Sequence, residues 1–333
     1  MSDGLVPADS GLARQPAEII RVADPCVALA PSSRQYYEFA FRAQFAEKKG
    51  AEFQRFFETI MSTKYGAVFR IVKAGGQRGD EKNDGYLPGS KTYFQVYAPG
   101  TGTQDVIAKK MDVDFEGAVA AWDVENWVFV HNDPDGLSTA INHKVDQLDE
   151  RNAGVKAVVW GREDLRRVLF SMPEADIASV LGAWSPSFQT MSEVGPDDLR
   201  HVIEHVSSQP DNPLEPVQPV PHDKAAKNRL SVGVEELLQV GMARMPLVEQ
   251  YFASDPKTDL GTGVASGMHR EYERLRDSGM APDDIFQELW VFTGGRLRQP
   301  STKHESAVLA ILAYFFWTCD VFERSEESGE ATA

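Results

Sequence analysis

Cysteine is scarce in this chain: only 2 of its 333 residues, Cys26 and Cys319, are cysteines. Two cysteines so far apart exclude a disulfide-built scaffold and a four-cysteine zinc site, and they are typical of a reducing compartment. Long apolar runs are also missing. The longest, Ala307–Trp317, has 11 residues, whereas a membrane-spanning helix needs about 20. Because the first residues also lack the pattern of a secretory signal, the sequence predicts a cytoplasmic protein with no membrane partner.

Basic residues are in the minority, with 34 against 50 acidic residues and a net charge of −16. This balance argues against a protein that coats nucleic acid by bulk charge. One segment departs from it, because Arg42 to Lys110 contains 12 basic and 7 acidic residues. Such a segment is compatible with one face that contacts phosphates, and equally with ordinary variation in surface charge.

The length predicts two domains, at roughly 100–200 residues per domain, and the hydrophobic fraction of 42% is ample for two cores. Five prolines between Pro210 and Pro221 are typical of an extended linker and divide the chain. The predicted parts are a flexible tail (1–32), a first domain (33–190), a helix with the proline-rich linker (191–228), a helical domain (229–325) and an acidic tail (326–333).

The first domain alternates between helical and strand patterns. Phe53, Phe56, Phe57 and Ile60 recur at helical spacing within Gly50–Met61. Short apolar or alternating runs predict strands, at residues 67–73, 92–97, 127–130 and 156–160. Helical segments are expected between the later strands. This order predicts an α/β domain with a mixed sheet that is flanked by helices on both faces.

The second domain shows only helical patterns. Apolar residues recur at spacings of three and four in the segments Leu230–Met242, Met268–Arg276, Pro282–Val291 and Ser306–Phe322. Pro282 and Asp283 are the residue types expected where a helix begins. The sequence therefore predicts an all-helical C-terminal domain.

The chemistry of the chain is concentrated around one glycine-rich turn. Asp84 lies in this turn, and Gln95 follows 11 residues later in a predicted strand, while Glu52 lies upstream on a predicted helix. Metal-dependent cleavage of a phosphodiester needs oxygen ligands around a hard cation such as Mg²⁺ or Mn²⁺. These three residues are therefore candidate metal ligands. A purely structural role is the alternative, because Asp favours turns beside glycine and Glu52 is well placed for a helix N-terminus.

The segment Gly79–Gly85 (GDEKNDG), followed by Gln95, resembles the PD-(D/E)XK nuclease superfamily, in particular Mrr-type restriction enzymes and Holliday-junction resolvases. The resemblance implies a restriction-endonuclease-like fold, a Mg²⁺- or Mn²⁺-dependent DNA nuclease, and Asp84, Gln95 and Glu52 as its site. Tyr97 stands where that family has a lysine. Lys91, Lys109 or Lys110 would then supply the positive charge, or else the domain keeps the fold without the activity.

A second resemblance covers about residues 35–325. The segments 79–100, 114–122, 227–231 and 307–323 are similar to effector proteins of bacterial ABC-three-component defence systems, which are relatives of Lamassu. This resemblance implies DNA as a target, and a middle component and an SMC- or ABC-type ATPase as partners. The expected function is a DNA-directed effector subunit. The alternative is a non-catalytic scaffold. Whether the chain also forms a homo-oligomer stays open.

A possible zinc-binding motif lies just before the proline-rich linker. His201, Glu204 and His205 match the H-x-x-E-H pattern of inverted zinc peptidases. A third ligand would have to come from Glu271 or Glu273. The polar face of an ordinary helix is the preferred interpretation.

Overall fold

The computed structural model describes residues 29–72, 83–99, 104–134, 136–152, 154–208, 224, 228–254, 260–294 and 301–318. They form two compact units. The sheet unit contains described residues 42–173, and the helical unit contains 29–41 and 174–318. The chain therefore divides after Pro173 and not near residue 190, because α7 (Phe188–Ser192) and α8 (Pro196–Ser207) pack against the last helix, α14 (Thr302–Thr318).

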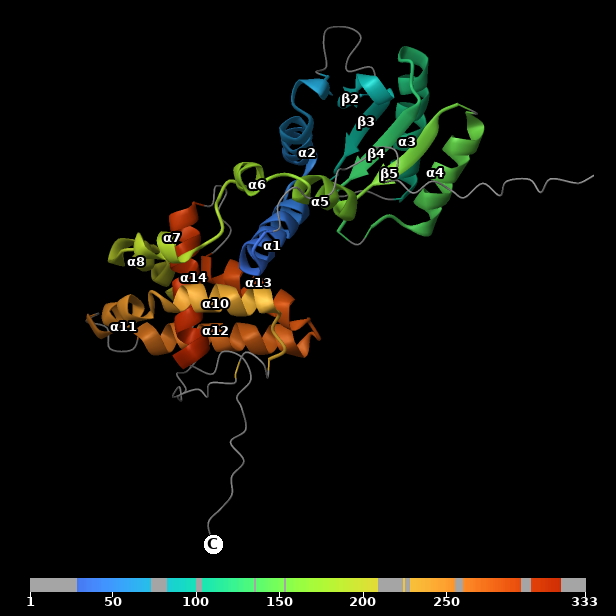
Figure 1. Cartoon of the computed structure of the whole chain (residues 1–333). Helices are drawn as coiled ribbons and strands as arrows, with labels where there is room; N and C mark the ends of the chain where they lie inside the picture. The colour runs from blue at the N-terminus through green and yellow to red at the C-terminus, as the bar shows by residue number, and fades with distance from the viewer. Residues whose placement is uncertain are drawn as a thin grey trace, which may run out of the picture. The chain divides into compact units, whose positions relative to one another are not determined.

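The sheet unit is built on one five-stranded mixed sheet with the strand order β1-β2-β3-β4-β5 (Figure 1). Strands β1, β2 and β3 pair antiparallel, whereas β3, β4 and β5 pair parallel. The strands are β1 (Arg70–Ile71), β2 (Gly85–Leu87), β3 (Thr92–Tyr97), β4 (Asn126–His131) and β5 (Lys156–Trp160). This arrangement confirms the predicted α/β domain with a mixed sheet.

Helices cover both faces of this sheet. On one face, α2 (Gly50–Tyr65) packs through Phe57, whose ring centroid lies 5.4 Å from that of Phe94 on β3. On the other face, α3 (Gln104–Ala121) and α4 (Thr139–Arg151) share an apolar core with Trp127 and Phe129 of β4. Helix α5 (Arg162–Phe170) packs against α2. Because side chains alternate along a strand, Gln95 and Tyr97 share the α3 face with Tyr93, opposite Phe94.

Two details of the N-terminal region differ from the prediction. Within residues 67–72, the described part of the predicted run 67–73, the strand is limited to β1, because Gly66 (φ 54°) begins a short 3₁₀ turn over Gly66–Val68. The predicted tail gives way to a helix, α1 (Pro31–Glu47), whose residues up to Phe41 group with the helical unit and whose later residues group with the sheet unit. Within the sheet unit, Phe45 of α1 packs against Phe53 of α2.

The helical unit is arranged around α14, whose side chains from Ser306 to Ala313 are all buried. Helices α7, α8, α10, α11 and α13 pack against it. Gly241 allows the closest approach, because a side-chain carbon there would meet Ala313 Cβ at 2.7 Å. The remaining helices are α6 (Glu174–Leu181), α10 (Val232–Met242), α11 (Met245–Ser254), α12 (Leu260–Asp277) and α13 (Pro282–Gly294).

The four helices predicted for this region are confirmed as α10, α12, α13 and α14. Helix α12 begins at Leu260, eight residues before the predicted start, and α13 begins at Pro282 as predicted. The predicted extension of the last helix to Phe322 lies outside the described residues, as does Cys319. In the part of the chain that the structure describes, no helix is both long and apolar enough to cross a membrane.

Candidate functional site

Asp84 and Gln95 meet on the face of the sheet that α3 covers. Strands β2 and β3 pair with Gly85 opposite Phe94, which sets Asp84 beside Gln95. Gln95 Nε2 donates a hydrogen bond of 2.8 Å to Asp84 Oδ2, and the Val96 backbone N–H donates one of 2.7 Å to the same oxygen. Both side chains are buried, with 5% of Asp84 and 4% of Gln95 exposed. The turn and the strand thus deliver the two predicted residues to one point.

The amide of Gln95 is only half satisfied. Its nitrogen is bound to Asp84, but its oxygen, Oε1, is buried and has no hydrogen-bond partner among the described residues. Burying an unpaired amide oxygen is costly, so a native structure that keeps one usually has a use for it. A carboxylate and an amide oxygen side by side are the ligand types that Mg²⁺ and Ca²⁺ prefer. The residues present therefore fit a hard divalent cation.

Glu52 occupies the first turn of α2 and its side chain is exposed. The start of α2 is fixed to the carboxyl ends of two strands, because Gly50 N–H donates to Ala98 O and Asn132 Nδ2 donates to Lys48 O, both at 2.7 Å. Glu52 therefore belongs to the same end of the sheet as Gln95. However, no three Asp, Glu, His or Cys side chains form a metal-holding group in the described ranges, so a preformed carboxylate cluster is absent there.

Lys91 lies at the opposite end of β3 from the Asp84–Gln95 pair. Four residues separate it from Gln95, which corresponds to about 13 Å along a strand. Its Nζ forms ion pairs with Glu125 at 2.8 Å and Asp123 at 2.9 Å. The hydrogen bonds to Glu125 and Asp123 raise the pKa of the Lys91 ammonium above its ordinary value. The structure therefore does not bring Lys91 to the candidate site.

Lys110 of α3 lies beside Tyr97, the residue at the position of the family's lysine. Its Nζ is 5.9 Å from the centroid of the Tyr97 ring and forms an ion pair with Asp114, which is fully buried. The Lys110 side chain keeps 34% of its surface exposed. Lys109, its neighbour on α3, is exposed. Of the three candidate lysines, Lys110 is the one with a demonstrated contact to the end of β3.

Two polar residues near this end of the sheet were missed in the sequence. Asp114 follows Lys110 by four residues, a helical ion-pair spacing that could have identified it. His131 ends β4 opposite Tyr97, and its Nδ1 accepts a hydrogen bond of 3.2 Å from the Asp133 N–H. Burial lowers the pKa of His131 to about 4. The imidazole is therefore neutral at physiological pH, and its only sequence signal was its place at the end of an apolar strand.

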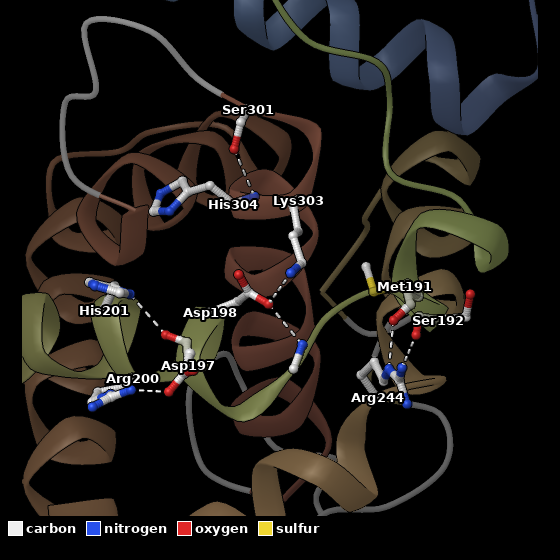
Figure 2. Close-up of polar contacts among 11 residues, drawn as sticks. Met191, Ser192, Asp197, Asp198, Arg200, His201, Arg244, Ser301, Lys303 and His304 are labelled. Atoms are coloured by element: carbon white, nitrogen blue, oxygen red, sulfur yellow. Dashed lines mark hydrogen bonds and ion pairs between the residues drawn. The ribbon is translucent and has the colours of Figure 1, made fainter.

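The H-x-x-E-H segment lies on α8 in a network that joins helices (Figure 2). His201 Nδ1 bonds to the Asp197 carbonyl oxygen at 2.8 Å, and Lys303 of α14 pairs with Asp198 at 3.0 Å. Arg244 donates to the carbonyl oxygens of Met191 and Ser192 at the end of α7. The Lys303–Asp198 pair ties α14 to α8, and Arg244, between α10 and α11, caps the end of α7. Neither Glu271 nor Glu273 joins the histidines in a metal site within the described residues.

Comparison with known proteins gives one match. Residues 197–323 match the model of the family described as C-terminal domain 10 of the ABC-three component (ABC-3C) systems. The match begins in α8 and includes α10 to α14, so it confirms the C-terminal part of the resemblance that the sequence suggested. No curated protein and no solved structure matches the chain.

Proposed function

We propose that the chain is an effector subunit of a bacterial defence complex and that its sheet unit cleaves DNA with the help of a divalent cation. The observation that carries the catalytic part is the buried, unpaired Gln95 Oε1 next to the Asp84 carboxylate. A hard cation would give Gln95 Oε1 a partner and would also be attracted by the Asp84 carboxylate.

The order of elements supports a restriction-endonuclease-like fold for this unit. A helix (α2), three antiparallel strands (β1 to β3), a crossover helix (α3) and a parallel strand (β4) follow one another along the chain. The resemblance of Gly79–Gly85 to the nuclease turn adds to this, with Asp84 at its end. Gly79 to Lys82 lie outside the described residues.

Each residue of the candidate site has a separate role in the proposed cleavage. Asp84 accepts a hydrogen bond from the amide of Gln95, and the two side chains would together hold Mg²⁺ or Mn²⁺. The bound cation would polarise the phosphate and make water a better nucleophile at neutral pH. Glu52, exposed at the same end of the sheet, orients the attacking water. Lys110, next to Tyr97, stabilises the charge that develops on the phosphate.

The helical unit supports the assignment to a defence complex. Its match is to a C-terminal domain type of three-component systems, so we infer that it docks the chain onto the other components. The partners proposed are a middle component and an SMC- or ABC-type ATPase, with DNA as the target of the assembly.

The direct test is cleavage of supercoiled plasmid by the full chain, alone and with its partner components, in Mg²⁺ or Mn²⁺. Asp84→Ala and Gln95→Leu should abolish cleavage and weaken Mn²⁺ binding measured by calorimetry. Lys91→Ala should cleave normally, because Lys91 lies at the other end of β3. Full cleavage by Asp84→Ala would refute the site.

A non-catalytic scaffold is the second candidate, and Tyr97 at the lysine position is the observation that favours it. In that case the natural chain is inert in every assembly, while Tyr97→Lys gains metal-dependent cleavage because it rebuilds the family pattern. If the natural chain cleaves and Lys110→Ala does not, the enzyme with a displaced lysine is the correct description.

A further inference from the structure

A row of aromatic side chains crosses the sheet next to the Asp84–Gln95 pair. Strand pairing sets Arg70 of β1 opposite Tyr86 of β2, and Tyr86 opposite Tyr93 of β3. The Tyr86 and Tyr93 rings are stacked, with centroids 5.3 Å apart and an interplanar angle of 3°. Trp122, just after α3, lies 5.5 Å from each of them. We call Tyr86, Tyr93 and Trp122, together with the Arg70 guanidinium that lies over Tyr86, the aromatic row.

The outer end of the aromatic row is open to solvent. Arg70 is exposed, and its guanidinium lies 5.7 Å from the centroid of the Tyr86 ring and donates a hydrogen bond of 3.2 Å to the Tyr86 hydroxyl. Tyr86 and Trp122 are partly exposed, while Tyr93 is buried beneath them. An exposed cation thus covers a stacked pair of aromatic rings, and a flat ligand can replace that cation by stacking.

The aromatic row and the candidate metal site share one sheet face. Tyr86 lies two residues after Asp84, and Tyr93 lies two residues before Gln95. The aromatic row and the Asp84–Gln95 pair therefore lie on the same side of the sheet. Two residues along a strand span about 7 Å. Bases along one DNA strand are about 3.4 Å apart, so the aromatic row is about two base steps from a phosphate held at Asp84 and Gln95.

We propose that the aromatic row binds an unpaired base of the DNA strand whose phosphate lies at Asp84 and Gln95. This inference rests on the proposed function and makes its substrate more specific: a DNA strand that is single, frayed or flipped near the cleavage point. Side chains stack on a base only when that base leaves its neighbours in the duplex. The displaced Arg70 guanidinium is then free to pair with the adjoining phosphate.

Binding without cleavage isolates this role. The full chain with Asp84→Ala is titrated, in Ca²⁺, with a fluorescent 15-nucleotide single strand and with a duplex of the same sequence. Removing the π surface with Tyr86→Leu, or the cation with Arg70→Ala, should weaken single-strand binding by about tenfold, within the range known for base stacking. Duplex binding should change by less than twofold. Tyr86→Phe keeps the ring and should bind normally.

A matched control is Arg166→Ala. Arg166 also covers an aromatic ring, that of Phe170 at 5.4 Å, but it belongs to α5 in the layer of α2. Its loss should leave single-strand binding unchanged. If Tyr86→Leu and Arg70→Ala lower thermal stability but not single-strand affinity, or weaken both DNA forms equally, the aromatic row is structural and the inference is wrong.

Cross-linking gives a second, independent readout. A single strand with 5-iodouracil at successive positions should cross-link to Tyr86 or Trp122 from one or two positions only, as mapped by mass spectrometry. Cross-links spread evenly along the strand, or confined to other peptides, would overturn the inference. Should the aromatic row bind single strands while Asp84→Ala leaves plasmid cleavage intact, the proposed metal site fails and the base-binding role survives.

Discussion

The two units of the chain differ sharply in charge. The sheet unit (residues 1–26 and 42–173) contains 20 basic and 23 acidic residues, a net charge of −3, whereas the helical unit (residues 27–41 and 174–333) contains 14 basic and 27 acidic residues, a net charge of −13. The DNA backbone is densely negative, so the acidic region is a poor partner for it. The difference supports a division in which the sheet unit meets DNA and the helical unit meets protein.

The two units also differ in the contacts that their buried polar groups make. In the helical unit, buried or partly buried cations bind backbone carbonyls at helix ends: Lys224 Nζ donates to Phe316 O at 2.8 Å, and Arg244 binds the end of α7. Folding explains such contacts, because helix termini leave carbonyls without partners. The Asp84–Gln95 pair caps no helix end and leaves Gln95 Oε1 unsatisfied. The helical unit also holds buried side-chain atoms without a hydrogen-bond partner among the described residues, such as Thr293 Oγ1. The hydrogen bond between Gln95 and the Asp84 carboxylate, and not the unsatisfied oxygen alone, therefore distinguishes the sheet unit.

The largest effects should come from opening either core. Trp127 is fully buried on the α3 face of the sheet, and Phe315 is 1% exposed in α14. Trp127→Ala and Phe315→Ala should each cost about 3–5 kcal/mol of unfolding free energy. If the units are stabilised separately, hydrogen exchange followed by mass spectrometry will show faster exchange only in the unit that carries the substitution. Equal acceleration in both units would show one cooperative fold.

Two titratable groups, Glu305 in the helical unit and His131 in the sheet unit, should contribute to stability with opposite dependence on pH. In the helical unit, burial raises the pKa of Glu305 from 4.5 to about 7, against the lowering effect of its 2.7 Å hydrogen bond from Trp290 Nε1. Its folded form holds the proton longer than the unfolded chain, so stability is lost as pH rises from 4.5 to 7. In the sheet unit, burial lowers the pKa of His131 from 6.5 to about 4. There the unfolded chain protonates first, so stability is lost as pH falls from 6.5 to 4.

Each of these pH effects amounts to roughly 3 to 4 kcal/mol at most, since one pKa unit corresponds to about 1.4 kcal/mol. Hydrogen exchange at pH 5 and pH 7.5, corrected for intrinsic rates, should show the opposed trends. Glu305→Gln should flatten the trend in the helical unit only, and His131→Asn that in the sheet unit only. A trend that survives its own substitution would assign it to another group.

Much of the fold could be predicted because its signals are local. Strands β3 and β5 have the predicted ends, since alternating or apolar residues mark them, and α13 begins at the predicted proline. Strand β2 is only three residues long and carries no readable period. Helix α1 was missed although Tyr37, Phe41 and Phe45, all buried, recur in it at helical spacing, so this signal was present in the sequence.

For the candidate site, the meeting of Asp84 and Gln95 could be predicted from the sequence, but the position of the lysine could not. Asp84 and Gln95 follow from a turn and a strand, which are local features. Three lysines near the motif were equally acceptable in the sequence, and only the fold separates them. Lys91 is paired at the far end of β3, whereas Lys110 reaches Tyr97 from α3. Lys91 is held away from the candidate site by its ion pairs with Asp123 and Glu125, and the positions of these two residues depend on tertiary structure.

The ion pair of Lys110 can be separated from its proposed role at the phosphate. Lys110→Met leaves the carboxylate of the fully buried Asp114 without its cation and should cost about 2 kcal/mol, less than for a wholly buried pair because Lys110 is 34% exposed. Adding Asp114→Leu should restore most of that stability, as measured by urea unfolding. If the restored double variant remains unable to cleave DNA, the role of Lys110 is chemical. Recovered cleavage would show that it is structural.

The smallest effect is expected at Lys91, and it tests whether position in the fold outweighs closeness in sequence. Its ion pairs with Asp123 and Glu125 are solvent-exposed, with 41% of the Lys91 side chain accessible. Exposed pairs contribute about 0–1 kcal/mol, and salt screens them. Lys91→Ala should therefore shift the midpoint of urea unfolding only slightly, and the shift should shrink in 0.5 M NaCl. A Lys91→Ala variant that unfolds normally but loses metal-dependent cleavage would place the missing positive charge at Lys91 and remove it from Lys110.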